Sequence, residues 1–331
     1  MSNWGIMATG TIAAKFAGTI HQMEKEGERL VAVASRDLEK AETFAKGYRS
    51  AKSPVKAYAS YEAMCKDPEV EVIYIATPNN FHFENVKLCL QHGKHVLCEK
   101  PFTLTVEEAR ELFALAKKEK LFLMEAFWVK HLPLVKKLDE MIWEGAIGKL
   151  KHMRADFGFL ASGARRTRKF KSELGGGALL DIGVYTIGFL QIFMKDKPSK
   201  IQSEVRMSEF GTDWFSELLC SYPGGETAVT TTAIGIQMPR EGVFYGTEGY
   251  IRLPDCQMVE ELELVKNDGT GETIKMPFDI NGFEYQIRDT TECIKTGRTE
   301  SHVMTAEDTC TIMELLENIR KSWNMHFPRE E

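Results

Sequence analysis

Short apolar runs alternate with segments of helical period in the first third of the chain. The apolar runs, which predict strands, cover residues 4–8, 30–34, 70–76, 95–98 and 121–124. Between them, apolar side chains recur every three or four positions and predict helices over residues 12–23, 38–48, 83–92 and 105–119, with Asp37 and Thr105 as N-caps. Because strands that alternate with helices build a parallel sheet with helices on both faces, residues 1–126 are expected to form one α/β domain.

The pattern changes after about residue 133, where apolar and polar positions alternate along longer segments. These segments, residues 151–159, 201–210, 216–222, 228–236 and 243–253, predict strands of an antiparallel sheet with one covered face. Two helical segments, residues 178–193 and 305–323, accompany them. Residues 127–331 therefore predict a second, α+β domain with a large, mainly antiparallel open sheet.

Composition narrows the class of protein. The 331 residues suit two domains, and 43% apolar with 27% charged residues is typical of soluble globular proteins. A net charge of −6 without a block of like charges argues against nucleic acid as a partner. No apolar run approaches 18 residues, and the N-terminus has no basic segment followed by an apolar one. We therefore expect no membrane span, no export signal and a cytoplasmic location.

The seven cysteines are odd in number and scattered, without a C-x-x-C pair. This distribution predicts buried thiols rather than a disulfide framework or a zinc ribbon, and no metal site is expected.

The turn after the first predicted strand carries a dinucleotide-binding pattern. It reads Gly5-Ile6-Met7-Ala8-Thr9-Gly10-Thr11-Ile12-Ala13, the G-x-G-x-x-A fingerprint with Ala8 in place of the first glycine. Gly10 lets the backbone approach a pyrophosphate, and the free N–H groups that begin the next helix attract its charge. A Rossmann-type dinucleotide site is therefore expected at Ala8, Thr9, Gly10, Thr11 and Ile12, with a plain tight turn as the alternative.

Ser35 and Arg36 follow the second predicted strand, where an NAD site would place an acidic residue for the ribose 2′-hydroxyl. The Arg36 cation suits a 2′-phosphate, so the sequence favours NADP over NAD. NAD is the alternative, because Asp37 is able to take the acidic role. After the next strand come Thr77, Pro78, Asn79 and His82, which are expected to contact the nicotinamide ribose unless they form an ordinary turn.

Two further segments carry residues suited to acid–base chemistry. Glu99 and Lys100 end another predicted strand on the ligand side of the sheet, where a lysine can polarise a substrate hydroxyl; a solvated ion pair between them is the alternative. Asp181 and Tyr185 stand four apart in a predicted helix and so share one face. The ordinary pKa of tyrosine is about 10, so Tyr185 needs a cation such as Lys100 to act as a base at neutral pH. Otherwise Tyr185 is a core aromatic residue.

In this order, these segments resemble the Gfo/Idh/MocA family of NAD(P)-dependent oxidoreductases. The family's hallmarks are the G-x-G-x-x-A turn, an E-K-P tripeptide and a G-G-G-x-L-x-D-x-G-x-H segment. The last two match Glu99-Lys100-Pro101 and Gly175-Gly176-Gly177-Ala178-Leu179-Leu180-Asp181-Ile182-Gly183-Val184-Tyr185. Tyr185 in place of the usual histidine is similar to the dihydrodiol dehydrogenase branch of the family. The resemblance covers nearly the whole chain.

The resemblance implies roles for residues at matching positions. Lys100 matches the family's catalytic lysine, with a cis peptide bond to Pro101 that aims it at the nicotinamide, and Glu99 is expected to contact the cofactor. Tyr185 matches the general acid/base, and Asp181 matches a carboxylate that orients the substrate.

The resemblance also implies a substrate pocket and an assembly. Trp128 and Phe157 match aromatic residues that line the pocket, with core packing as the alternative. Specificity is expected to depend on loop side chains such as Arg165, Arg166 and Trp214. The family often dimerises through its open sheet, so a homodimer is expected.

These residues predict an NADP-dependent dehydrogenase that moves hydride between a secondary hydroxyl of a diol or sugar and the nicotinamide. Tyr185 would remove the hydroxyl proton while Lys100 stabilises the oxyanion. One alternative is a sugar or inositol-type dehydrogenase or reductase of the same family, although Tyr185 in the histidine position argues against the inositol type. Another is a non-catalytic NADP-sensing regulatory protein, against which the joint presence of Lys100, Asp181 and Tyr185 argues.

Overall fold

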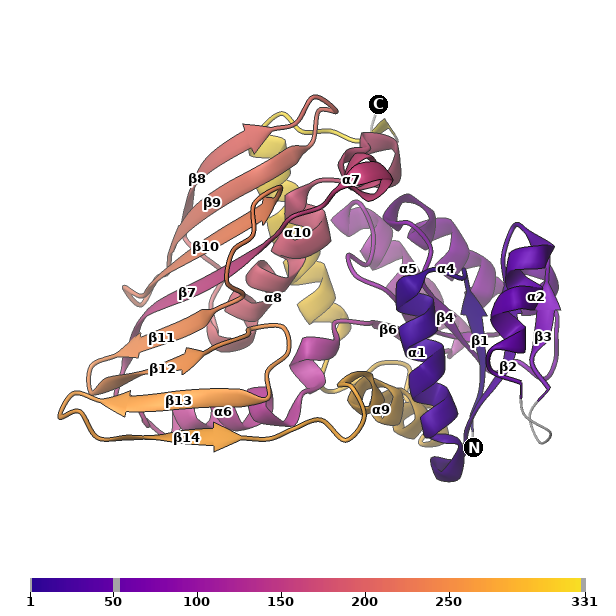
Figure 1. Ribbon diagram of the computed structural model, residues 1–331, viewed down its shortest axis with the longest axis horizontal. Coiled ribbons are helices and arrows are strands. Elements are labelled where there is room, and N and C mark those ends of the chain that lie inside the picture. Colours follow the sequence, from indigo (N-terminus) through magenta and orange to yellow (C-terminus); the bar gives the residue numbers. More distant parts are fainter. Residues whose placement is uncertain (1, 50–53, 329–331) are drawn as a thin grey trace. The chain divides into compact units, whose positions relative to one another are not determined.

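The computed structural model describes residues 2–49 and 54–328, without the side chains of residues 164–167. The chain divides into two compact units, one formed by Met1–Trp128 with Asp279–Cys310 and the other by Val129–Phe278 with Thr311–Glu331. Each unit has its own sheet, and strands of both are labelled in Figure 1. The side chains of Arg165 and Arg166, which were expected to influence specificity, lie outside the described residues.

A six-stranded parallel sheet forms the centre of the first unit, in the order β3-β2-β1-β4-β5-β6. The strands are β1 (Ser2–Met7), β2 (Glu28–Ala34), β3 (Lys56–Tyr58), β4 (Val72–Ile75), β5 (His95–Cys98) and β6 (Leu123–Glu125). This order is that of dinucleotide-binding Rossmann domains, and it reverses between β1 and β4, where such sheets bind ligands beyond the carboxyl ends of the strands. The predicted Rossmann fold is confirmed.

Helices connect these strands, and all of them except α3 begin within one residue of a predicted start. They are α1 (Thr11–Gln22), α2 (Leu38–Lys46), α3 (Tyr61–Cys65), α4 (His82–Gln91) and α5 (Val106–Glu119). The predicted N-caps are present: Asp37 accepts a hydrogen bond from the N–H of Lys40 at 3.3 Å, and Thr105 accepts one from Glu108 at 3.2 Å. The sequence pattern therefore located β1, β2, β4, β5 and β6 and the starts of four helices, but it missed β3 and α3.

A helix from late in the chain, α9 (Phe283–Lys295), also belongs to the first unit. The ring of Phe283 lies 6.3 Å from that of Phe16 in α1, and the Thr291 hydroxyl donates a hydrogen bond to Glu28 at 3.0 Å. At the edge strand β6, the N–H of Leu123 donates to the carbonyl of Thr299 at 3.1 Å. The alternation pattern assigned residues 127–331 to one domain and gave no sign of this return, since α9 itself was not predicted.

An eight-stranded sheet forms the second unit, in the order β14-β13-β12-β11-β7-β10-β9-β8. The strands are β7 (Leu150–Phe159), β8 (Lys200–Met207), β9 (Asp213–Ser221), β10 (Thr227–Ile234), β11 (Gly242–Gly246), β12 (Gly249–Leu253), β13 (Glu261–Lys266) and β14 (Gly271–Lys275). Only β7 and β10 pair in parallel, so the predicted mainly antiparallel sheet is confirmed. Trp214, expected in a loop, lies in β9.

Two details of this sheet differ from the sequence prediction. Residues 243–253 form the hairpin β11–β12 rather than one strand. The chain turns over Thr247 and Glu248, between the two strands. At Gly246, the last residue of β11, an added Cβ would lie 2.0 Å from the carbonyl oxygen of Ile147, so only glycine fits against this distant segment. Strands β13 and β14 were not predicted, although the alternation over residues 261–266 and the turn residues after it were available as a signal.

α-Helices accompany this sheet, and α8 packs against β7 and β10 (Figure 1). They are α6 (Pro133–Trp143), α7 (Gly163–Phe170), α8 (Val184–Phe193) and most of α10 (Ala306–Ser322). The segment Ser172–Phe193, which ends with α8, is long and apolar enough to cross a membrane, contrary to the expectation that no segment would be. Its most apolar window is 83% buried inside the protein, as in the core helix of a folded domain.

All seven cysteines are thiols that form no disulfide, and six of them are buried. This agrees with the prediction from their number and spacing.

Candidate active site

The predicted dinucleotide turn joins β1 to α1 in the first unit. Gly10 is the N-cap of α1, with φ −79°, and an added Cβ there would meet no protein atom within 4 Å. Neither backbone conformation nor packing therefore requires glycine at this position, whereas the close approach of a ligand would. The first turn of α1 contains no acidic residue to oppose an anion. The turn fits a dinucleotide pyrophosphate, and residues 8–12 would hold it.

Ala8, the departure from the fingerprint, has φ +87°. This left-handed conformation costs an alanine about 1 kcal/mol, which explains why a glycine is usual there. The N–H of Ala8 donates to the carbonyl of Ala34 at 2.9 Å, so the turn keeps its place beside the end of β2. Alanine in place of the usual glycine therefore strains the turn, but the turn still forms.

Arg36 follows β2 and is exposed, with its guanidinium 5.5 Å from the centre of the Phe81 ring. The neighbouring Ser35 accepts a hydrogen bond from the N–H of Asp37 at 3.3 Å. The carboxylate of Asp37 caps α2 and pairs with Lys40 at 3.2 Å. Because Asp37 is already engaged in these contacts, the cation of Arg36 is the more available group for a ribose substituent.

His82 connects two loops at the carboxyl ends of the central strands. It is fully buried, and its two ring nitrogens lie 2.9 Å from the carbonyl oxygens of Thr77 and Pro101. The Thr77 hydroxyl in turn accepts a hydrogen bond from Asn85 at 3.0 Å. His82 therefore holds the loop after β4 against the loop that carries Lys100. Pro78 and Asn79 belong to the same loop and are partly exposed.

Lys100 follows β5, and its peptide bond to Pro101 is cis, as the resemblance implies. The adjacent Glu99 is buried and accepts a hydrogen bond from the hydroxyl of Tyr74 in β4. Burial raises the pKa of Glu99, while the charges of Lys100 and Lys15 and the Tyr74 hydrogen bond lower it. The cationic side chain of Lys100 is thus set beside a buried carboxyl group.

Lys15, on α1, is a second cation of this cluster that sequence reasoning missed. Its ammonium lies 4.4 Å from the ring centre of Phe283 and 5.0 Å from that of Trp128. Burial lowers the pKa of Lys15, and the charges of Glu284 and Glu99 raise it. Trp128, expected in the substrate pocket, is 3% exposed and packs edge-on against Phe283 at 5.2 Å. In this unit Trp128 is therefore a packing residue as well as a partner of Lys15.

Glu125, at the end of β6, is a fully buried carboxyl group close to this cluster. Its Oε1 accepts a hydrogen bond from the N–H of Phe102 at 3.1 Å. Burial raises the pKa of Glu125 to about 8, with a smaller increase from the charge of Glu99. Glu125 is therefore protonated and neutral at neutral pH. Its side chain then adds no negative charge to the buried region around Glu99.

Replacing Glu125 with glutamine is expected to raise the melting temperature at alkaline pH but not at pH 5. The folded chain keeps the proton of Glu125 up to about pH 8, whereas the unfolded chain releases it near pH 4.5. The stability that Glu125 contributes is therefore fully present below pH 4.5 and is lost as the pH rises through 8. Glutamine cannot ionise and keeps the acceptor for Phe102. We expect a gain of several degrees at pH 9, at roughly 2–4 °C per kcal/mol.

Thermal denaturation followed by circular dichroism between pH 5 and 9 measures this gain. The matched control is Glu111→Gln, which removes an exposed carboxylate paired with Lys87 at the surface. A difference between wild type and Glu125→Gln that does not change with pH would contradict the buried titration.

In the second unit, the three glycines before α8 lie against the end of α7. The N–H of Gly177 donates to the carbonyl of Lys169 at 2.8 Å, and that of Gly176 donates to Lys171 at 3.0 Å. An added Cβ on Gly176 would lie 2.5 Å from the Lys169 carbonyl oxygen, and one on Gly177 would lie 2.5 Å from Oδ1 of Asp213. The glycines are needed because two backbone segments and a buried carboxyl group meet here.

Asp213 holds the start of the helix that carries the predicted catalytic residues. It is fully buried, and its Oδ2 accepts a hydrogen bond from the N–H of Leu179 at 2.9 Å. Burial raises the pKa of Asp213 to about 7. Leu179–Gly183, the residues directly before α8, form a π-helical turn rather than the predicted α-helix. Such turns are rare and occur frequently at functional sites.

Asp181 lies in the π-helical turn and Tyr185 in the first turn of α8. Asp181 forms an ion pair with Lys169, and its side chain is 23% exposed. Tyr185 is 7% exposed, and its ring lies 5.9 Å from that of Phe157 on β7. The predicted pocket residue Phe157 thus accompanies Tyr185, whereas Lys100 and Trp128 belong to the first unit.

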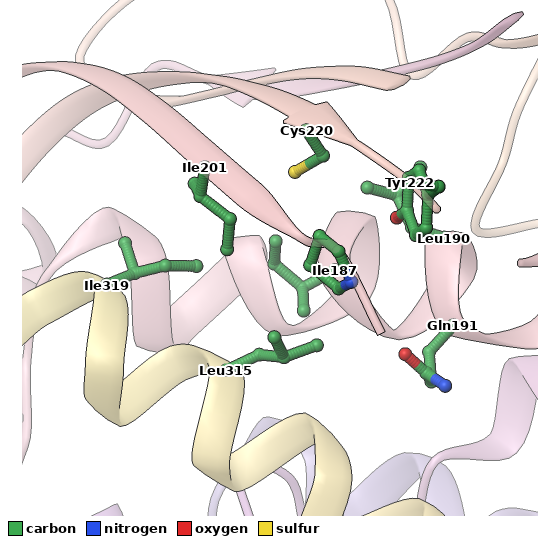
Figure 2. Close-up of a pocket in the computed structure, with 9 residues that line it drawn as sticks. Ile187, Leu190, Gln191, Ile201, Cys220, Tyr222, Leu315 and Ile319 are labelled. Atoms are coloured by element: carbon green, nitrogen blue, oxygen red, sulfur yellow. The ribbon is translucent and has the colours of Figure 1, made fainter. Parts of the chain in front are cut away.

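Figure 2 shows a cavity in the second unit that carries none of these predicted residues. It lies among α8, β8, β9 and α10 and measures about 10 Å³, enough for one water molecule at most. Its lining is mainly apolar: Ile187, Leu190, Gln191, Pro198, Ile201, Cys220, Tyr222, Leu315 and Ile319. It is a packing defect of the core and not a ligand site.

Comparisons with known proteins agree with the geometry. Residues 2–127 match the oxidoreductase family with an NAD-binding Rossmann fold, and residues 135–252 match the GFO/IDH/MocA C-terminal domain. The trans-1,2-dihydrobenzene-1,2-diol dehydrogenase of Mus musculus is 37% identical over 339 residues, which cover 99% of this chain and 98% of that protein. The Homo sapiens enzyme of the same name is 35% identical over 335 residues, with the same coverage.

Among solved structures, KijD10, a 3-ketoreductase from Actinomadura kijaniata in complex with NADP and TDP-benzene, matches with a TM-score of 0.86. It is 24% identical and 97% of each chain is covered, so this likeness supports the fold alone. The family matches and the full-length relatives confirm the resemblance read from the sequence. This chain belongs to the Gfo/Idh/MocA family of oxidoreductases, with an NAD-binding Rossmann domain and the family's C-terminal domain.

Proposed function

We propose that the protein is an NADP-dependent dehydrogenase that transfers hydride between a secondary hydroxyl of a diol or sugar and the nicotinamide. The observation that carries the proposal is full-length similarity to dehydrogenases of a vicinal diol, at 37% identity, together with Lys100, Asp181 and Tyr185 at the matching positions. A Rossmann fold alone would not imply this chemistry, because the same fold serves many functions.

In this proposal the cofactor supplies the hydride acceptor. Tyr185 takes the proton of the reacting hydroxyl as general base and returns it in the reverse direction. The ammonium of Lys100 donates a hydrogen bond to the same substrate oxygen and stabilises its developing negative charge. Asp181 accepts a hydrogen bond from a neighbouring hydroxyl and so orients the substrate. The proposal requires Lys100 and Tyr185 to meet at one substrate oxygen.

Turnover of a substrate panel tests the proposal. The panel contains trans-dihydrodiols, aldoses, inositols and simple secondary alcohols with NADP⁺, and the corresponding carbonyls with NADPH. Faster turnover of vicinal diols or aldoses than of simple alcohols is expected. Tight binding of NADPH without reduction of any carbonyl would instead favour a sensing protein, and turnover restricted to inositols would favour the inositol-type alternative.

Arg36→Ala is expected to raise KM for NADPH by about 10–100-fold and to leave KM for NADH nearly unchanged. The reason is the loss of charge-assisted hydrogen bonds to a 2′-phosphate, which contribute about 1.5–3 kcal/mol. Initial rates at varied cofactor concentration measure both constants. Arg29→Ala, which removes another exposed arginine of the same β-strand region, is the control and should change neither KM. Equal losses for NADPH and NADH would assign Arg36 to the adenine ring alone.

We also propose a homodimer formed through the face of the large sheet that points away from α8. This face exposes Leu219, Tyr245 and Tyr250, at 41%, 41% and 37%. Tyr245 packs against Tyr250 at 6.1 Å and against His152 at 5.8 Å, which makes a continuous aromatic surface. Light scattering after size exclusion gives the molar mass that decides this proposal. Separately, we propose that the protein is located in the cytoplasm, as expected from its sequence.

A further inference from the structure

Lys169, the next-to-last residue of α7, forms the ion pair with Asp181 that the sequence did not indicate. The two side chains are 13% and 23% exposed, so the pair is largely shielded from water. Charges in such a place interact more strongly than an exposed surface pair. The ammonium also lies 5.1 Å from the ring centre of Phe159 on β7 and so forms a cation–π contact with this ring.

The backbone around Lys169 is fixed on both sides. Its carbonyl accepts the N–H of Gly177 at 2.8 Å, and the carbonyl of the following residue, Phe170, accepts the hydroxyl of Thr212 at 2.8 Å. Phe170 is itself buried, at 2% exposure. The side chain of Lys169 therefore starts from a fixed backbone position, from which its ammonium reaches Asp181.

The charge of Lys169 matters for the chemistry proposed above. Oxidation of a hydroxyl builds negative charge on the substrate oxygen, and an uncompensated carboxylate nearby would oppose that charge. A paired ammonium cancels this repulsion and holds the carboxylate in one orientation. Asp181 can then act as a hydrogen-bond acceptor for a neutral hydroxyl next to the reacting one.

We propose that Lys169 is a positioning residue that acts through Asp181, fixing the orientation of its carboxylate and neutralising its charge while a substrate hydroxyl is bound. This inference rests on the proposed function. The substrate class that fits this role is a polyol, because a carboxylate held by Lys169 can accept a hydrogen bond from a second hydroxyl next to the reacting carbon.

The test compares Lys169→Met, Lys169→Arg, Asp181→Asn and the double variant Lys169→Met/Asp181→Asn on the best diol of the panel. Lys169→Met is expected to lower kcat by about 10–100-fold with KM for NADP⁺ unchanged, as a misplaced substrate contact does. Lys169→Arg keeps the cation and should recover most of the rate. The double variant should be no slower than Asp181→Asn, because the two residues act as one unit.

The matched control is Lys171→Met, which removes an exposed lysine of the same segment and should stay within twofold of wild type. If Lys169→Met fails to fold, Lys169→Gln takes its place. Losses that multiply in the double variant, no recovery with arginine, or an effect no larger than that of Lys171→Met would each overturn the inference.

Thermal denaturation of the same variants without cofactor or substrate separates this inference from the proposed function. The double-variant cycle should show coupling between Lys169 and Asp181 in the melting temperatures. A wild type that turns over no member of the panel overturns the proposed function and the role of Lys169 with it. An active wild type whose cycle shows no coupling overturns only the role of Lys169.

Discussion

Tyr185→Phe is expected to lower kcat for diol oxidation by about 10²–10⁴-fold, the usual contribution of a positioned general acid or base. Phenylalanine keeps the ring that packs 5.9 Å from Phe157 but lacks the group that takes the proton. The Kd for NADPH should stay the same, because the predicted phosphate contacts lie at residues 8–12 of the first unit. Steady-state kinetics and fluorescence titration of NADPH measure the two quantities.

Lys100→Met provides the second arm of this experiment and should also reduce kcat by at least 10²-fold. The matched control is Tyr222→Phe, which removes a phenol hydroxyl from a tyrosine of similar burial in the second unit, 7% exposed, that has no proposed role. Its activity should stay within twofold of wild type. Full activity in Tyr185→Phe or Lys100→Met would refute the assigned roles.

Gly176→Ala is expected to destabilise the protein by about 1–3 kcal/mol and to reduce activity as well. The added Cβ would lie 2.5 Å from the carbonyl oxygen of Lys169 and 2.8 Å from that of Lys171, and both are backbone atoms that cannot turn aside. The segment that carries Lys169 must therefore move. Thermal denaturation should show a melting temperature lower by several degrees, at roughly 2–4 °C per kcal/mol.

Gly18→Ala, in the middle of α1, is the contrasting substitution. An added Cβ there would meet no atom within 4 Å, and alanine favours a helix over glycine by up to about 1 kcal/mol. Its melting temperature should equal or exceed that of wild type. If Gly176→Ala behaved like Gly18→Ala, the close contact between the glycine segment and α7 would not exist in solution.

The sequence predicted the first unit well because its information is local. The strands β1, β2, β4 and β5 are short buried runs between helices with visible caps such as Asp37 and Thr105. The return of α9 to this unit was missed because it depends on contacts of Phe283 with Phe16 and of Thr291 with Glu28, more than 250 positions earlier in the chain. Local alternation carries no record of such a contact.

The same limit applies to the candidate site. Gly10, Lys100 and Tyr185 occur in motifs with recognisable spacing, whereas Lys15 and Lys169 look like any other lysine of a helix. What distinguishes them is a tertiary partner: the rings of Phe283 and Trp128 for Lys15, and Asp181 for Lys169. Partners of this kind become visible only once the chain is folded.

The hydrogen bond between Leu123 and Thr299 has a consequence for synthesis of the protein. The edge strand of the nucleotide-binding unit gains this contact only after the ribosome has added residue 299. At about 5–20 residues per second, residue 299 is added roughly 9–34 s after residue 128. Until then the face of α1 that receives Phe283 is exposed to solvent and to chaperones. A fragment that ends at residue 128 is therefore expected to aggregate rather than to yield a separate nucleotide-binding module.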